Sequence, residues 1–214
     1  MFCRHDLAWL TARGWDAALD AALPGQHSAI EQWRRAGWPT VVRRADTDLA
    51  VGQVSLGIPL PPAPDGTKGR IALRASEDDV ARCTSPVALS DAVQAAPSRW
   101  RRPLQSLAAS MPLHSYGSLA MQAITGQVYL TPASDIDLLF FPADRDALRA
   151  GLAVLEQHAA MLPLDGEIVF PCGGAVAWKE WINAVQHRAR VLVKDATAVR
   201  LAPIEELLAT LEGA

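Results

Sequence analysis

Two aspartates separated by a single residue form the clearest chemical signal in the chain. They lie in the segment Ser134-Asp135-Ile136-Asp137, which leads into the apolar run LLFF. On a β-strand, residues i and i+2 project from the same face, so both carboxylates point the same way while Ile136 and Leu138 face the core. Adjacent carboxylates repel each other, and a divalent cation between them removes that repulsion. Oxygen ligands favour Mg²⁺ or Mn²⁺, although an isolated Asp-x-Asp pattern is more commonly a solvated strand end or turn.

A Gly-Ser pair precedes the aspartates and indicates a phosphate site. Gly117 and Ser118 end the strand-like segment LHSYGS, and the helix-like segment LAMQAITG that follows is closed by Gly126. Glycine lets backbone approach a ligand closely, and the first turn of a helix offers N–H groups at its positive dipole end. A phosphate-binding turn followed by a strand with Asp-x-Asp predicts metal-dependent phosphoryl or nucleotidyl transfer. A serine hydrolase is not indicated, because Ser118 lacks the Gly-x-Ser-x-Gly frame.

The elements around these residues alternate between strand and helix, which predicts an α+β fold. Residues 1–85 are expected to form a small N-terminal α+β domain, with a helix over 28–37 and a long loop over 57–69. Residues 86–214 are expected to form a second domain, a mixed sheet with helices. Its helices are predicted at 85–97, 103–111, 119–126, 144–162, 175–186 and 203–213, and its further strands at 133–142, 165–170 and 188–201.

Composition limits the function classes. The chain has 214 residues, a net charge of -3 and 20% charged residues, which predicts a folded protein without the basic surface that duplex nucleic acid requires. We expect no membrane span, because no apolar run approaches 18–20 residues. Three widely spaced cysteines and the charged start MFCRHD favour a cytoplasmic protein without a disulfide framework or signal peptide.

The Gly-Ser and Asp-x-Asp patterns together resemble the nucleotidyltransferase superfamily related to DNA polymerase β. Gly117, Ser118, Asp135 and Asp137 match its pattern of Gly-Ser, a helix, and Asp-x-Asp on the next strand. This resemblance implies a nucleotidyltransferase-like catalytic domain over 86–214 and a third carboxylate on a later strand. In DGEIVF the candidates are Asp165, which also suits a turn, and Glu167, which also suits an exposed strand position. Glu167 is preferred because it lies inside the apolar strand, with Asp165-Gly166 as the preceding turn.

Longer phrases extend a narrower resemblance over nearly the whole chain. The segments RHDLAWL, WPTVVRR, YGSLAMQAITG, YLTPASDIDLL and DGEIVFPCGGAVAWKEW look like those of the phosphoribosyl-dephospho-CoA transferases of malonate decarboxylase systems, which are holo-acyl-carrier-protein synthases. The resemblance implies transfer of the prosthetic group from 2'-(5''-triphosphoribosyl)-3'-dephospho-CoA to a serine of the apo acyl-carrier subunit, with release of pyrophosphate.

The same resemblance implies roles for the candidate residues. Asp135 and Asp137 would bind Mg²⁺, which neutralises the triphosphate and the leaving pyrophosphate. Glu167 would complete the metal site or accept the serine proton. Gly117 and Ser118 would bind the β- and γ-phosphates through backbone N–H groups and the hydroxyl.

Two lysines and two tryptophans are secondary candidates. Lys179 follows a Gly-Gly turn and could bind the phosphates or the carrier, although a helix-surface lysine is the commoner case. Lys194 could reach the triphosphate or simply end a strand. Trp178 and Trp181 share a helix face, which favours core packing over stacking on adenine.

Two other function classes fit parts of the pattern. One is a nucleotidyltransferase that uses ATP to modify a small molecule or another protein. The other is a non-catalytic regulatory module that keeps the fold. The intact Asp135/Asp137 pair argues against the latter, because a pure binding protein gains nothing from concentrating that charge.

Overall fold

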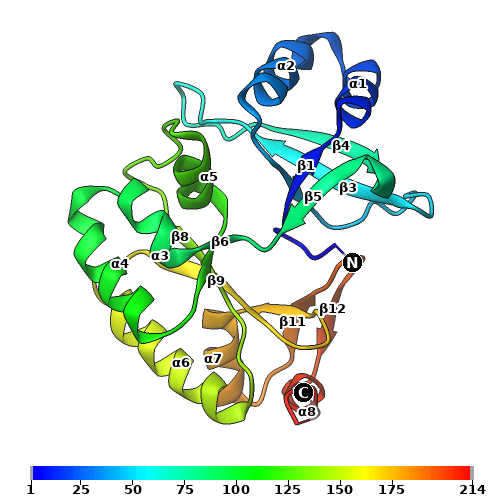
Figure 1. The fold of residues 1–214 in the computed structure, drawn as a ribbon. Helices are drawn as coiled ribbons and strands as arrows, with labels where there is room; N and C mark the ends of the chain where they lie inside the picture. The colour runs from blue at the N-terminus through cyan, green and yellow to red at the C-terminus, as the bar shows by residue number, and fades with distance from the viewer. Residues whose placement is uncertain (1, 213–214) are drawn as a thin grey trace. The chain divides into compact units, whose positions relative to one another are not determined.

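The computed structural model describes residues 2–212, and the chain divides into two compact units between Pro86 and Val87. This division lies beside the domain boundary expected after residue 85. Figure 1 shows the ribbon, and each unit is described by itself below. Both units combine a sheet with helices, which confirms the predicted α+β class. Among the helices of residues 2–212, none is both long enough and apolar enough to cross a membrane.

The N-terminal unit is an antiparallel sheet with two helices. Within the described residues its strand order is β4-β3-β2-β1-β5, and each neighbouring pair is antiparallel. The elements are β1 (Leu7–Leu10), α1 (Ala12–Asp20), α2 (His27–Ala36), β2 (Thr40–Val42), β3 (Gln53–Pro59), β4 (Arg70–Ser76) and β5 (Val80–Thr84). The helix predicted over 28–37 is α2, which begins one residue earlier and ends at Gly37 in the left-handed conformation. The predicted loop over 57–69 begins later, because β3 continues to Pro59.

Helix α1 was not predicted, although its start carries a recognisable signal. The Thr11 hydroxyl accepts the N–H of Gly14, which is the hydrogen bond of an N-cap. The helix buries Trp15 and Ala18, a spacing of three residues that places both side chains on one face. With nine residues, α1 is too short for periodicity alone to separate it from a loop.

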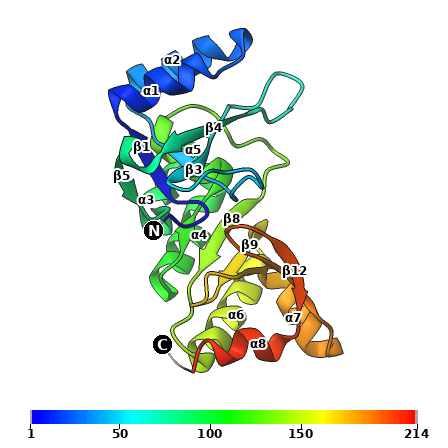
Figure 2. The same ribbon diagram turned by 90° about the vertical axis from the view of Figure 1, so that its right-hand side faces the viewer.

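The second unit is built on a sheet with the strand order β12-β11-β10-β9-β8-β7-β6 in the described part of the chain. Its strands are β6 (Val87–Ala88), β7 (His114–Ser115), β8 (Ile136–Phe140), β9 (Leu164–Val169), β10 (Ala175–Ala177), β11 (Val191–Lys194) and β12 (Val199–Ala202). Its helices are α3 (Leu89–Ala92), α4 (Ser98–Ser110), α5 (Gly117–Thr125), α6 (Arg145–Ala159), α7 (Trp178–His187) and α8 (Ile204–Ala209). Figure 2 shows α6, α7 and α8 gathered on one side of this sheet.

One face of the sheet packs against these helices and forms the core. Ile136 and Leu138 are almost completely buried in it, as predicted from their alternation with the aspartates. Val191 and Val193 on β11 belong to the same core. Burying aliphatic side chains of this size contributes about 1.5–3 kcal/mol each. The opposite face carries the alternate residues, including Asp137.

Strands β8 and β9 run parallel and are joined through α6. Their register places Asp137 opposite Asp165 and Leu138 opposite Gly166. Gly166 has φ +134, and a Cβ there would lie 1.9 Å from the Leu138 carbonyl oxygen. The expectation that Asp165-Gly166 forms a turn is therefore wrong, because the glycine lies inside β9 and permits a close approach of two strands.

Helix α4 also differs from its prediction. The sequence predicts that this helix starts at residue 103. It begins at Ser98, so Arg99, Arg101 and Arg102 lie within its first two turns and Pro103 lies inside the helix. Trp100 and Leu104 are buried on the inner side of α4. This packing stabilises the helical turn that precedes Pro103.

Candidate active site

Three aspartates meet at neighbouring positions of strands β8 and β9. Asp135 immediately precedes β8, Asp137 lies on β8 and Asp165 lies on β9. Each offers one carboxylate oxygen, and these oxygens all lie within 4.8 Å of one another. The Ser134 hydroxyl accepts the Thr131 N–H at 2.9 Å and so fixes the turn that leads to Asp135. We call Asp135, Asp137 and Asp165 the acidic cluster.

A buried amide fixes the loop that delivers Asp135. Gln122 on α5 accepts the backbone N–H groups of Tyr129 and Leu130 through Oε1, both at 3.0 Å. Its Nε2 donates to the Ala95 carbonyl oxygen at 2.6 Å. One side chain thus ties the α5–β8 loop to two helical segments. Sequence reasoning missed Gln122, because a glutamine inside a helix carries no signal of such a long-range contact.

The start of α5 lies directly against the acidic cluster. Gly117 has φ +63, and a Cβ on it would lie only 2.2 Å from Oδ2 of Asp137. The Tyr116 N–H donates to the Asp137 carbonyl oxygen at 3.1 Å, so backbone contacts fix the same approach. Ser118 is buried in the first turn of α5. The structure therefore brings the predicted phosphate turn and the Asp-x-Asp strand together, and only glycine fits between them.

Glu167 lies outside the acidic cluster, although the sequence analysis prefers it over Asp165 as the third carboxylate. Its side chain is 5% exposed, and Oε1 forms an ion pair with Nζ of Lys194 on β11 at 2.9 Å. Asp165, two residues earlier on β9, takes the place beside Asp135 and Asp137. Sequence reasoning assigned Asp165 to a turn and therefore ranked the two carboxylates in the opposite order.

Lys179 reaches the edge of the acidic cluster from the first turn of α7. Its Nζ lies 3.7 Å from a carboxylate oxygen of Asp165 and 5.5 Å from the centroid of the Trp178 ring. The side chain is half exposed, so solvent reaches the ammonium group. Trp178 and Trp181 are buried, which supports core packing for both rings.

His114 on β7 lies opposite Leu139 of β8 and packs against an aromatic ring. Its ring meets the Phe141 ring edge-on, with centroids 5.4 Å apart. Partial burial lowers the pKa of the imidazole, because desolvation disfavours its charged form. His114 therefore supports the packing beside β8.

Comparisons with known proteins identify the family. Residues 88–205 match the family model described as the C-terminal domain of phosphoribosyl-dephospho-CoA transferase MdcG, and residues 3–86 match the model of its N-terminal domain. The chain belongs to the phosphoribosyl-dephospho-CoA transferase family. The C-terminal model spans the acidic cluster, the start of α5 and both lysines described above.

Relatives with that name cover most of the chain. A phosphoribosyl-dephospho-CoA transferase of Xanthomonas campestris pv. campestris (strain 8004) is 40% identical, over 94% of this chain and 93% of the relative. One of Bradyrhizobium diazoefficiens is 40% identical over 83% and 80%, and one of Pseudomonas aeruginosa is 34% identical over 77% of each. No solved structure matches the chain.

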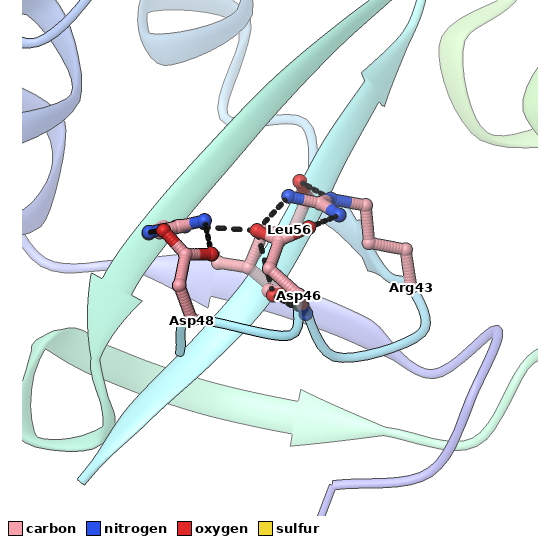
Figure 3. Close-up of polar contacts among 6 residues, drawn as sticks. Arg43, Asp46, Asp48 and Leu56 are labelled. Atoms are coloured by element: carbon pink, nitrogen blue, oxygen red, sulfur yellow. Dashed lines mark hydrogen bonds and ion pairs between the residues drawn. The ribbon is translucent and has the colours of Figure 1, made fainter. Parts of the chain in front are cut away.

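The N-terminal unit of this family member contains a charged cluster of a different kind. Oδ2 of Asp46 accepts hydrogen bonds from two arginines, from Arg43 Nη2 at 2.6 Å and from Arg74 Nε at 2.8 Å. Figure 3 shows Arg43 and Asp48 close to Asp46. Arg74 also pairs with Asp48, and Arg43 donates to the Leu56 carbonyl oxygen. The hydrogen bonds from Arg43 and then Arg74 hold the pKa of Asp46 well below its usual range. These contacts fasten the β2–β3 loop to the β3–β4 hairpin.

A cavity beside this cluster does not add a candidate site. Its volume is about 420 Å³, and its lining residues are Ala18, Ala21, Ala22, Arg43, Asp46, Ala72, Leu73 and Arg74. Both arginines are already neutralised by aspartates, so the cluster presents no net charge to a ligand. We assign the cluster a structural role.

Proposed function

We propose that this protein transfers the phosphoribosyl-dephospho-CoA group from 2'-(5''-triphosphoribosyl)-3'-dephospho-CoA to a serine of the apo acyl-carrier subunit of malonate decarboxylase. Pyrophosphate is the second product, so the enzyme is a nucleotidyltransferase. One observation carries the chemical part of the proposal. Three carboxylates converge beside the start of α5, which can lie this close to Asp137 only because residue 117 is glycine. Family membership supports the choice of donor.

The acidic cluster fits a divalent cation. Its three donors are carboxylate oxygens, which are the hard ligands that Mg²⁺ and Mn²⁺ prefer, and they converge within 4.8 Å. We therefore assign Asp135, Asp137 and Asp165 as the residues that hold Mg²⁺. When bound, the cation would neutralise charge on the triphosphate and on the departing pyrophosphate.

The start of α5 is assigned to the β- and γ-phosphates of the donor. The first-turn N–H groups of a helix point out of its N-terminus at the positive end of its dipole. At α5 these groups begin with Gly117 and Ser118. Lys179, at the Asp165 side of the acidic cluster, adds a positive charge that can turn toward the α-phosphate of the donor. This arrangement holds the leaving group next to the metal-binding carboxylates.

The transfer step then needs an acceptor oxygen and a proton acceptor. The serine hydroxyl oxygen bonds to the α-phosphorus, and the bond from that phosphorus to the β-bridging oxygen breaks as pyrophosphate leaves. We assign Asp165 to accept the serine proton, because it lies on β9, the strand farther from the phosphate turn.

Glu167 and Lys194 are assigned a supporting role at the same site. A buried carboxylate is costly unless a cation pairs with it, and Lys194 supplies that cation at 2.9 Å. The pair holds the Lys194 ammonium group beside Glu167, two residues after Asp165 on β9, and we assign this positive charge to favour the negatively charged transition state. Glu167 is thus a positioning residue for Lys194.

A donor comparison tests the proposed function. Pyrophosphate release is measured with the triphosphoribosyl donor and with ATP, each with and without the apo carrier subunit and with Mg²⁺ present. We expect release with the triphosphoribosyl donor, dependent on the carrier, together with the matching mass increase of the carrier. Release with ATP alone, and none with the triphosphoribosyl donor, would show a different nucleotidyltransferase.

A further inference from the structure

Strands β11 and β12 form a hairpin whose outer face is unusually apolar. Cross-strand pairs are Leu192 with Leu201 and Lys194 with Val199, so these four side chains share one face. The alternate residues Val191, Val193 and Ala202 are fully buried in the core on the other face. On the outer face, Leu192 is 36%, Val199 40% and Leu201 55% exposed. We call Leu192, Val199 and Leu201 the hairpin patch.

The hairpin patch lies on the same face of the sheet as the acidic cluster. Asp165 and Glu167 lie two residues apart on β9 and so share a face, and Glu167 is paired with Ala177 on β10. Ala175, two residues before Ala177, is paired with Lys194 on β11. Side chains of paired residues, and of residues two apart on one strand, share a face. The ion pair of Glu167 with Lys194 confirms this face independently.

The strand order indicates on which side of the acidic cluster the leaving group and the attacking serine lie. The phosphate turn follows β7 and touches Asp137 on β8, so the proposed leaving group lies at the β7–β8 side of the acidic cluster. In phosphoryl transfer the attacking and leaving oxygens lie roughly in line on opposite sides of the phosphorus. The attacking serine therefore approaches from the β9 side, which leads across Lys194 to the hairpin patch.

We infer that the acceptor protein docks on the hairpin patch, with aliphatic side chains beside its serine packing on Leu192, Val199 and Leu201. The inference rests on the proposed function, which requires a protein acceptor at this site. Exposed aliphatic side chains clustered on neighbouring strands are uncommon on a surface that binds nothing. Apolar groups at the centre of an interface also supply most of its affinity.

The test measures the KM for the apo carrier and the KM for the donor separately in the variant Leu201→Asp. A charge in the centre of the hairpin patch is expected to raise KM for the apo carrier at least about tenfold, which matches the loss typical of an important interface residue. The donor KM and the rate at saturating carrier stay unchanged. Leu201→Thr keeps a strand-forming residue and is expected to give a smaller rise of the same kind. Met161→Asp is the matched control, since Met161 is 61% exposed and follows α6 in the helical layer.

Each outcome has a distinct meaning. If the wild-type protein transfers nothing to the carrier, the proposed function fails. If the wild-type protein is active and both Leu201 variants keep the wild-type carrier KM, the docking inference is overturned. A rise in donor KM alone would assign the hairpin patch to the apolar arm of the donor, and a change in elution volume would assign it to a second copy of this chain. Either result also overturns the inference. Thermal unfolding of each variant checks that the fold is retained.

Discussion

Asp165 and Glu167 lie two residues apart on β9 and project from the same face, yet they have different partners. Asp165 lies opposite Asp137 and joins the acidic cluster, whereas Glu167 is buried and paired with Lys194. The sequence could predict that Asp135 and Asp137 share a face, because that follows from strand geometry alone. It could not rank Asp165 against Glu167, because residues two apart share a face and only the neighbouring strands distinguish them.

The variants Asp165→Asn and Glu167→Gln should therefore differ in the Mg²⁺ concentration that transfer requires. Asp165→Asn is expected to raise the Mg²⁺ concentration for half-maximal transfer at least about tenfold, because it removes a carboxylate ligand, and to lower the rate at saturating Mg²⁺, because an amide does not accept the serine proton. Glu167→Gln should lower the transfer rate and leave the Mg²⁺ requirement unchanged. The measurement is a Mg²⁺ titration of carrier modification for both variants. The opposite pattern would restore Glu167 as the third metal ligand.

At the level of elements, the contact of α5 with β8 creates the site. The sequence predicted both elements and the end of α5 at Gly126, which adopts the left-handed conformation in the structure. It also suggested a special role for Gly117, but the contact with Asp137 is visible only once β8 is placed. Gly166 was misjudged for the same reason, because a glycine that admits a neighbouring strand looks the same in sequence as a turn glycine.

Gly117→Ala tests this contact, with Gly126→Ala as its matched control. Both glycines have positive φ, +63 and +70, so alanine costs about 1–2 kcal/mol of stability at either position. Only at Gly117 would the new Cβ meet another group, Oδ2 of Asp137 at 2.2 Å, whereas nothing lies within 4 Å at Gly126. The transfer rate should fall at least about 100-fold in Gly117→Ala, since it displaces a catalytic group.

Gly126→Ala should lose stability but keep its transfer rate. Thermal unfolding and initial rates of carrier modification are measured for both variants. Equal rates in the two variants would show that Asp137 does not need the close approach of α5.

At the level of the whole molecule, the chain is two units with separate cores. The core of the second unit draws its members from Leu89 to Leu211, all on one side of the division at Pro86. Alternating strand and helix signals allowed the α+β class to be predicted. The strand order was not predictable, because pairings such as β7 with β8 and β9 with β10 depend on long-range packing and not on local pattern.

A fragment of residues 87–214 should consequently fold without the N-terminal unit. We expect one cooperative thermal transition by circular dichroism and Mn²⁺ binding with the affinity of the full chain, because the acidic cluster lies within this unit. A fragment that shows no cooperative transition would mean that the second unit depends on the first for its stability.

The central claim is that the acidic cluster holds the divalent cation used in transfer. The most direct test is the rate of carrier modification, followed by mass spectrometry, in the double variant Asp135→Asn/Asp137→Asn with saturating Mg²⁺ and donor. Since a metal ion supplies several kcal/mol of transition-state stabilisation, the rate should fall at least about 1,000-fold while the thermal transition is retained. Transfer at the wild-type rate would contradict the assignment of these carboxylates.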